Sequence, residues 1–405
     1  MNDTNSKSTV EHLEELIDIP NVDKVWYLST RKFLLSPKVK QFNRLNIIDI
    51  FDGYEPYLID RDYFEKGINQ VGLLPTFVLD SNVVGSLHQL FNKKNINESD
   101  KKSLLNFIDN LIIDDGSNRF YDINPIFYIL ECLLKDVADN YIIDNLASII
   151  LLQSLDLKAF KKNNMNFQKD MSLENEYLSK YGTFNLNEVS RIMFKSIKST
   201  KQEIQSFKKS VDLTYLFLLK IAQIDIYETK LTVLQKIKTV KKFYLDSIGV
   251  FSAREINIAI YYFHSTIGGF IPTKQKTYKV VLETIYNSAL DISLLRFTET
   301  MLSQGKRELT AIVYPVTFEQ HVSKIGQDLT LSMQSVLKSG EFYSLFKTTL
   351  SLIEKSKDLN NIINDTNGLS EHDIIERFNT RSKLNNLLIE QLIKDIELSI
   401  MQVKT

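Results

Sequence analysis

The chain has 405 residues, and its 43% hydrophobic content is enough for a buried core in one large domain or in several smaller ones. Its 49 Lys and Arg residues nearly balance its 50 Asp and Glu residues, which gives a formal net charge of -1. This balance excludes a bulk basic surface for nucleic acid, so any nucleic-acid binding must use a local patch of cations.

The cysteine content and the apolar segments indicate where the protein is located. The single cysteine, Cys132, excludes an intramolecular disulfide framework and a zinc site built from thiolates. Residues 1–9 are polar with no apolar segment behind them, so we expect no secretory signal. The most apolar internal segments, 142–155 and 215–226, are interrupted well short of the ~18 to 20 residues that a membrane span needs. We therefore expect a cytoplasmic protein without a membrane helix.

The first apolar run of interest ends in a carboxylate. Residues 1–70 combine a polar tail with short strand-like pieces, and we expect an N-terminal extension there. Apolar residues from Leu73 to Leu79 then predict a short buried strand that ends at Asp80. An Asp in this position is commonly a helix N-cap or a turn residue, but the carboxyl ends of strands also bind ligands in open α/β sheets. Taken alone, Asp80 allows both interpretations.

A second acidic residue lies inside an apolar helix. Asn124-Pro125 predicts a helix start, because proline at the first position of a helix lacks only an N–H that would have no partner. The helix that follows contains Glu131 among residues that are almost all apolar. Burial of an uncompensated charge costs several kcal/mol, so Glu131 must be exposed, paired with a base, or bound to a cation.

The middle of the chain, from about residue 145 to 280, has a helical pattern. Few glycines and prolines, 13 and 7 in the whole chain, agree with a largely helical protein. Basic clusters at Lys161-Lys162, at Lys208-Lys209 and within 236–242 form either a local patch for substrate or ordinary solvated helix faces.

Two further acids follow in the next segments. Residues 284–301 predict a helix that places Asp291 among leucines and isoleucines, and residues 309–314 predict a β-branched strand. Glu319 lies just past the end of that strand, as Asp80 lies past the end of the first. Residues 331–405 are expected to be helical, with an amphipathic segment from Ile374 to Ile396. Its apolar face is expected to pack on the domain, with self-association or a protein partner as the alternative.

Four segments, 78–83, 124–131, 289–296 and 316–319, contain these acids in a fixed order, and that order resembles the PIN-like metal-dependent nucleases. The match covers roughly residues 71–145 and 280–330. This chain departs from the family in two ways: the gap between the second and third acids is far longer than in a minimal domain, and the fourth acid is Glu where Asp is usual.

The resemblance implies a fold and a division of the chain. We expect an α/β protein with a PIN-like three-layer α/β/α core around a central, mainly parallel sheet. Residues 71–330 would form this nuclease domain, with a large helical insertion at about 145–280. Residues 1–70 would be the N-terminal extension and 331–405 a C-terminal helical region.

The resemblance also implies catalytic residues that hold Mg²⁺ or Mn²⁺. Asp80 and Asp291 are expected as direct ligands, Glu131 as a direct or water-mediated ligand, and Glu319 in an outer position. Carboxylates that lie close together repel one another unless a divalent cation neutralises them, and such cations prefer oxygen ligands. Three more residues are expected at the substrate or behind the acids: Asn82, Thr317 and Arg296.

The implied function is an endonuclease that hydrolyses phosphodiester bonds. RNA is favoured over DNA because much of the family acts on RNA, and a bacterial toxin or antiphage defence effector is the expected biological class. The alternatives are a DNA-cleaving nuclease and a catalytically inactive interaction protein, whose helical insertion or C-terminal helix binds a partner or a second copy. A histidine-based hydrolase is disfavoured because the 5 histidines show no ligand spacing.

Overall fold

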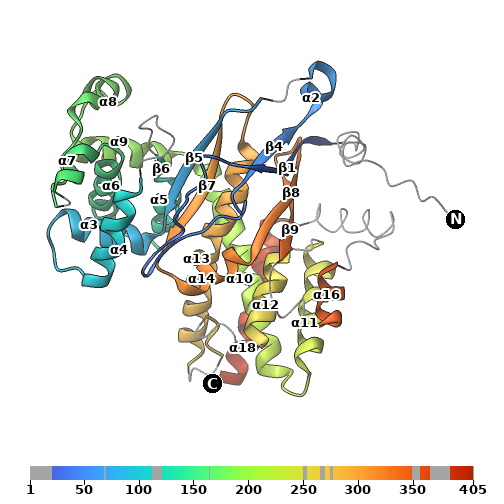
Figure 1. Ribbon diagram of the computed structural model, residues 1–405. Coiled ribbons are helices and arrows are strands. Elements are labelled where there is room, and N and C mark those ends of the chain that lie inside the picture. Colours follow the sequence, from blue (N-terminus) through green and yellow to red (C-terminus); the bar gives the residue numbers. More distant parts are fainter. Residues whose placement is uncertain are drawn as a thin grey trace.

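The computed structural model describes residues 21–67, 70–111, 121–163, 165–249, 253–264, 270–273, 277–348, 356–364 and 384–404, and the elements below lie within these ranges. Figure 1 shows a mixed α/β arrangement with two sheets in the middle of the molecule and helices around them. The predicted α/β class and the presence of parallel strands are therefore confirmed.

A five-stranded mixed sheet forms the centre of the fold. Its order is β2 (Gln41–Phe42), β3 (Leu45–Ile47), β7 (Thr310–Thr317), β5 (Leu73–Leu79) and β6 (Asp122–Asn124). Strand β5 runs parallel to both β6 and β7, whereas β3 is antiparallel to β7 and to β2. The sheet is thus parallel at its centre and antiparallel on the side of β3.

The two central strands are buried along most of their length. The last five residues of β5, Pro75 to Leu79, are buried, and so are the last six residues of β7, Ile312 to Thr317. Continuous apolar strands of this kind are typical of parallel sheets whose two faces are both covered. The strand predicted to end at Asp80 is confirmed as β5, and the strand predicted at 309–314 extends to Thr317.

A second sheet corrects the expectations for both ends of the chain. It is antiparallel and has the order β4 (Tyr54–Ile59), β1 (Val22–Lys32), β8 (Leu329–Leu337) and β9 (Phe342–Thr348). The prediction that residues from 331 onward are all helical is wrong at β8 and β9. Along β8 buried residues tend to alternate with half-buried ones, which is the period of a strand. The expected N-terminal extension and C-terminal tail are joined here, because β1 pairs with β8.

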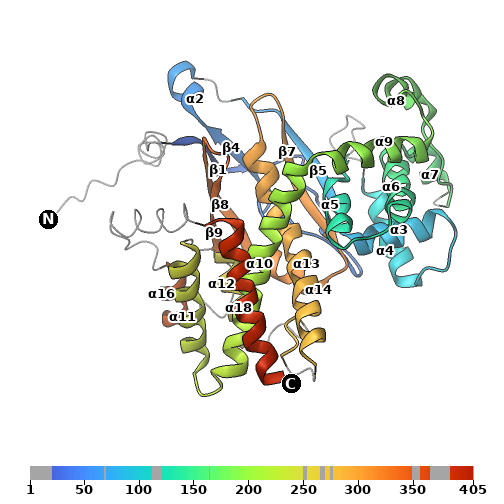
Figure 2. The same ribbon diagram turned by 180° about the vertical axis from the view of Figure 1, so that it is seen from behind.

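The helical character predicted for residues 145–280 is confirmed in the described residues. The helices of this region are α6 (Asp139–Gln153), α7 (Leu157–Lys162), α8 (Glu174–Tyr181), α9 (Leu186–Ser199), α10 (Lys201–Tyr227), α11 (Val233–Phe243) and α12 (Ala253–Phe263), with a 3₁₀ turn at Met171–Leu173 and a π turn at Tyr244–Ile248. In Figures 1 and 2, α6 to α9 gather on one side of the five-stranded sheet, and α10 to α12 lie on the other.

The remaining helices connect the strands or pack on the insertion. They are α2 (Arg61–Lys66), α3 (Ser81–Phe91), α4 (Glu98–Asp109), α5 (Ile126–Leu134), α13 (Tyr278–Gln304), α14 (Gln320–Gln327), α16 (Lys357–Asn364) and α18 (Asn386–Lys404). Figure 2 shows α18 beside α10. The Tyr215 hydroxyl donates to Glu397 at 2.7 Å, and Ile389 and Ile396 are buried. The described part of the C-terminal amphipathic segment therefore packs on the domain as expected, whereas residues 374–383 lie outside the described residues.

Among the helices that the structure describes, none has the combination of length and apolar character that crossing a membrane requires.

The β5–β7 pairing gives a stability prediction. A Cβ atom on Gly72, which immediately precedes β5, would overlap the backbone carbonyl oxygen of Glu308, which precedes β7. Backbone cannot move aside as a flexible side chain can, so we expect Gly72→Ala to lower the free energy of unfolding by about 1–3 kcal/mol. Urea denaturation measures this change.

A matched substitution on the adjoining helix is the control. Gly85 in α3 has nothing within 4 Å of an added Cβ, so Gly85→Ala should leave stability unchanged or raise it by about 0.5–1 kcal/mol. Equal stability of the Gly72→Ala and Gly85→Ala proteins would contradict the close approach at Gly72.

Candidate functional site

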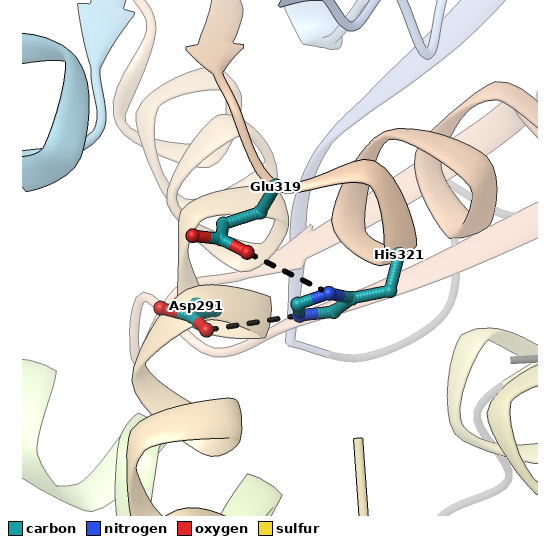
Figure 3. A group of neighbouring side chains, drawn as sticks. All are labelled: Asp291, Glu319 and His321. Atoms are coloured by element: carbon teal, nitrogen blue, oxygen red, sulfur yellow. Dashed lines mark ion pairs between the residues drawn. The ribbon is translucent and has the colours of Figure 1, made fainter. Parts of the chain in front are cut away.

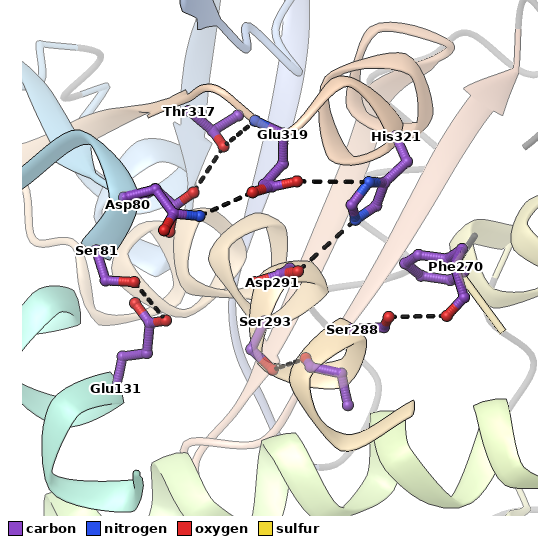
Figure 4. Close-up of polar contacts among 12 residues, drawn as sticks. Asp80, Ser81, Glu131, Phe270, Ser288, Asp291, Ser293, Thr317, Glu319 and His321 are labelled. Carbon is purple, nitrogen blue, oxygen red and sulfur yellow. Dashed lines mark hydrogen bonds and ion pairs between the residues drawn. The ribbon is translucent and has the colours of Figure 1, made fainter. Parts of the chain in front are cut away.

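The four predicted acids come from four separate elements and meet at one point. Figure 3 shows Asp291, Glu319 and His321, and Figure 4 shows the wider group with Asp80 and Glu131. Carboxylate oxygens of Asp80, Glu131 and Asp291 lie within 4.8 Å of one another, and so do ligand atoms of Asp291, Glu319 and His321. Asp291 belongs to both groups. The structure thus brings together all four acids that the sequence singled out.

Asp80 lies at the carboxyl end of β5, and its backbone N–H donates to the Val316 carbonyl of β7 at 3.0 Å. It occupies the N-cap position of α3, but its side chain makes no capping hydrogen bond. The carboxylate instead accepts a hydrogen bond of 2.8 Å from the Thr317 hydroxyl. The N-cap interpretation is therefore right about the position of Asp80 and wrong about its carboxylate, which faces the other acids.

Thr317 and Asn82 hold two of the acids, as expected for polar residues beside a cluster. The Thr317 hydroxyl also accepts the backbone N–H of Glu319 at 2.9 Å, so it links Asp80 to the start of α14. The Asn82 amide donates to Glu319 Oε1 at 2.7 Å. These contacts fix where the carboxylates of Asp80 and Glu319 lie.

Glu131 is 1% exposed and only partly satisfied. Its Oε1 atom accepts from the Ser81 hydroxyl at 2.9 Å and from Lys135 Nζ at 2.6 Å, one turn further along the chain. Its Oε2 atom is buried and has no hydrogen-bond partner among the described residues. A buried carboxylate oxygen without a donor is costly, and a cation is one partner that would satisfy it.

The cluster is electrostatically strained. Burial raises the pKa of Asp80 well above its usual value, and the nearby charges of Glu131, Asp291 and Glu319 raise it further, against the hydrogen bond from Thr317. Burial lowers the pKa of Lys135, but the carboxylates of Glu131, Asp291 and Asp80 outweigh burial and raise it overall. Lys135 therefore stays protonated and offsets part of the negative charge.

His321 is a member of the site that the sequence analysis did not select. Its Nε2 atom lies 3.7 Å from Asp291 Oδ2, and its Nδ1 atom lies 3.7 Å from Glu319 Oε2. The imidazole ring is thus directed at two carboxylates (Figure 3). The one signal in the sequence was its position two residues after Glu319, which is too weak to distinguish it from the other histidines.

Arg296 does not belong to this cluster, and the expectation that it lies near Asp291 is wrong. Five residues of an α-helix correspond to about 140° of rotation, so Arg296 points away from Asp291. Its guanidinium pairs with the buried Glu255 of α12, and Arg254 pairs with Glu299 beside it. Arg296 is therefore part of a group of ion pairs between α13 and α12.

The basic clusters of the insertion are partly engaged in local ion pairs. Lys208 lies 2.5 Å from Asp212, and Lys236 lies 2.9 Å from Asp225. Lys241 donates to the Ile362 carbonyl at 2.8 Å. Contact of these clusters with substrate stays a prediction.

Comparison of this chain with family models, with curated proteins and with solved structures found no match. The chemistry of the site must therefore be inferred from its own geometry. Carboxylate oxygens are the ligands that Mg²⁺ and Mn²⁺ prefer, and the unpartnered oxygen of Glu131 beside Asp80 and Asp291 fits such a cation.

The raised pKa of Asp80 has a consequence for stability in metal-free protein. Below the pKa of the unfolded chain, ~3.9, Asp80 is protonated in both states and contributes nothing. As pH rises toward the folded-state pKa, the unfolded state ionises first and folding stability is lost. Asparagine cannot ionise and its amide oxygen still accepts from Thr317, so with a chelator at neutral pH Asp80→Asn should be about 1–2 kcal/mol more stable than wild type.

Thermal unfolding followed by circular dichroism across pH ~4 to ~8 measures this difference, which should shrink toward the acid end. Asp109→Asn, at the exposed end of α4, is the control and should stay within about 0.5 kcal/mol of wild type. A less stable Asp80→Asn protein at neutral pH, or a gain independent of pH, would show that Asp80 is not strained.

Proposed function

We propose that this protein is a metal-dependent endonuclease with a PIN-like core. The main support is the convergence of Asp80, Glu131 and Asp291 within 4.8 Å, with an unpartnered buried oxygen on Glu131. Such a group of like charges costs folding free energy, and a carboxylate whose pKa is raised by burial and by neighbouring charges, as that of Asp80 is, is typical of functional sites. A divalent cation would neutralise them.

The position of the acids in the fold supports the same proposal. Asp80 and Glu319 follow the carboxyl ends of β5 and β7, which are parallel neighbours. Ligands of open α/β sheets bind in the crevice beyond the carboxyl ends of the strands. Asp291 and Glu131 reach the same end of these strands from α13 and α5, and the four acids follow the chain order of the PIN-like nucleases. The three-layer PIN-like arrangement of the core is part of this proposal.

Each residue has a definite task in the proposed reaction. Asp80, Asp291 and Glu131 would hold the cation, while Thr317 and Ser81 orient the carboxylates of Asp80 and Glu131. The bound cation supplies positive charge for a phosphate and makes an attached water easier to deprotonate. Lys135 keeps the Glu131 carboxylate in place before the cation binds.

The proposed substrate is nucleic acid, with RNA favoured over DNA by the resemblance. A cluster of acids repels phosphates until a cation is bound, so substrate affinity should depend on the metal. The chain's nearly even charge agrees with a site that gains its attraction from the metal rather than from a basic surface. A toxin or antiphage effector acting in the cytoplasm is the biological setting we propose.

Cleavage of labelled single-stranded RNA, structured RNA and DNA with Mg²⁺ or Mn²⁺ tests the proposal. We expect metal-dependent cutting by wild type and a loss of about 100-fold or more in Asp80→Asn and in Asp291→Asn, because even partners behind metal ligands commonly contribute 10–100-fold. Asp109→Asn should cut like wild type. The substrate that is cut distinguishes RNA from DNA.

Thermal stability with Mn²⁺ separates an inactive scaffold from an intact site. An ion that binds only the folded state adds about 2.7 kcal/mol at a concentration of 100 times its dissociation constant. We expect a Tm increase in wild type and a smaller one in Asp80→Asn. Equal cutting by all variants would point to a contaminating nuclease. The absence of both cutting and a Tm shift would favour the catalytically inactive interaction protein.

A further inference from the structure

The four acids and His321 form two overlapping groups rather than one. Asp80, Glu131 and Asp291 make the inner group, and Asp291, Glu319 and His321 make the outer group, with Asp291 shared between them. The outer group differs in chemistry because it contains an imidazole. It also contains Glu319, the acid that departs from the family pattern.

The outer group is held in place before any ligand binds. Asn82 donates to Glu319 Oε1, which leaves Glu319 Oε2 directed at His321 Nδ1. The ring of Phe270 lies against the imidazole with a centroid distance of 4.9 Å, and the Phe270 carbonyl accepts from the Ser288 hydroxyl of α13 at 2.8 Å. Figure 4 shows Phe270 and His321 side by side at the edge of the cluster. The ring therefore loses little further rotational freedom on binding an ion.

His321 Nε2 is the unused atom of this group. It is buried and has no hydrogen-bond partner among the described residues, although Asp291 Oδ2 lies 3.7 Å away. Two ligands of one ion with bonds of about 2.0–2.2 Å lie between ~3 and ~4.4 Å apart. The 3.7 Å separation of Nε2 from Asp291 Oδ2 falls within this range, and one ligand atom from each of Asp291, Glu319 and His321 lies within 4.8 Å of the others.

We propose that Asp291, Glu319 and His321 form a second divalent cation position, and that the imidazole makes this position prefer Mn²⁺ to Mg²⁺. The inference deepens the proposed function and rests on it for the inner position. Mg²⁺ is bound by oxygen ligands and releases its waters reluctantly, whereas imidazole nitrogen suits transition metals. The unpartnered Nε2 would bind the ion beside Asp291, while Nδ1 faces Glu319 Oε2, which orients the ring.

The role of Glu319 follows from this arrangement. The arm of glutamate is one methylene longer than that of aspartate, which lets a residue at the end of β7 reach both Asn82 and His321. Ligand atoms of Glu319 group with those of Asp291 and His321 within 4.8 Å, whereas the inner group consists of Asp80, Glu131 and Asp291. Glu319 is thus the acid of the outer position rather than a fourth ligand of the inner one.

Titration of the protein with Mn²⁺, with free Mn²⁺ measured by electron paramagnetic resonance, tests the proposal. Wild type should bind two ions for each chain, and His321→Gln should keep one and bind the second at least about tenfold more weakly. Mg²⁺ should displace one ion readily and the other poorly in wild type, and this difference should disappear in His321→Gln. His88→Gln is the matched control, because His88 bonds to Ser148 in α6 and should bind Mn²⁺ as wild type does.

If His321→Gln does not fold, pulsed electron paramagnetic resonance of Mn²⁺ bound to the wild-type protein still tests the proposal. Wild type should show coupling of Mn²⁺ to an imidazole nitrogen, and its absence would overturn the proposal. A single bound ion in wild type, or two ions of unchanged affinity in His321→Gln, would overturn it as well. Two bound ions with nitrogen coupling but no nucleic-acid cleavage would support the second cation position and contradict the proposed nuclease activity. Cleavage by protein that binds one ion would support the nuclease activity and contradict the second position.

Discussion

The parallel pairing of β5 with β7 is the constraint on which the rest of the structure depends. The register runs from Leu73 opposite Thr310 to Leu79 opposite Val316, and Asp80 continues it through a backbone hydrogen bond. Parallel neighbours end at the same edge, so Asp80 and Glu319 lie together although most of the chain separates them. Parallel strands also need a long crossover connection. The helical insertion lies in the long connection between β5 and β7. Its length therefore does not change the pairing that brings Asp80 and Glu319 together.

The helix α13 contacts two parts of the molecule through different sides. Asp291 faces the acids, whereas Arg296, about 140° further round the helix, and Glu299, about 80° further round, pair with Glu255 and Arg254 of α12. The amide of Gln334 in β8 donates to the Glu299 carbonyl at 3.0 Å, which ties the second sheet to the same helix. Breaking a buried ion pair on one side is strongly destabilising, so these pairs keep α13 in place. Asp291 is therefore positioned by ion pairs that its own helix makes on other sides.

The acidic cluster lowers the folding stability locally, and the buried core compensates for this loss. Three carboxylates within 4.8 Å repel one another, and two of them, Asp80 and Glu131, are almost fully buried. Hydrogen bonds from Thr317 and Ser81 and the ammonium of Lys135 offset only part of this cost. The buried strands on either side supply the remainder through their apolar burial. Proteins commonly give up stability in this way at functional sites.

The sequence by itself determined the local features: the strand before Asp80, the apolar helix around Glu131, the helical middle of the chain and the four acids. These features depend on residue type and on periodicity over a few turns, which neighbouring residues decide. Only the tertiary structure decided which segments pair. The second sheet joins β1 to β8 from opposite ends of the chain, so no local pattern could indicate it. His321 became part of the site because α14 turns it toward Asp291 on another helix, and Arg296 was lost from it because helical rotation turned it away. Strand pairing and the direction in which a side chain points depend on residues far apart in the sequence, whereas periodicity depends on neighbouring residues. For this reason the sequence determines the elements, and only the tertiary structure decides how they come together.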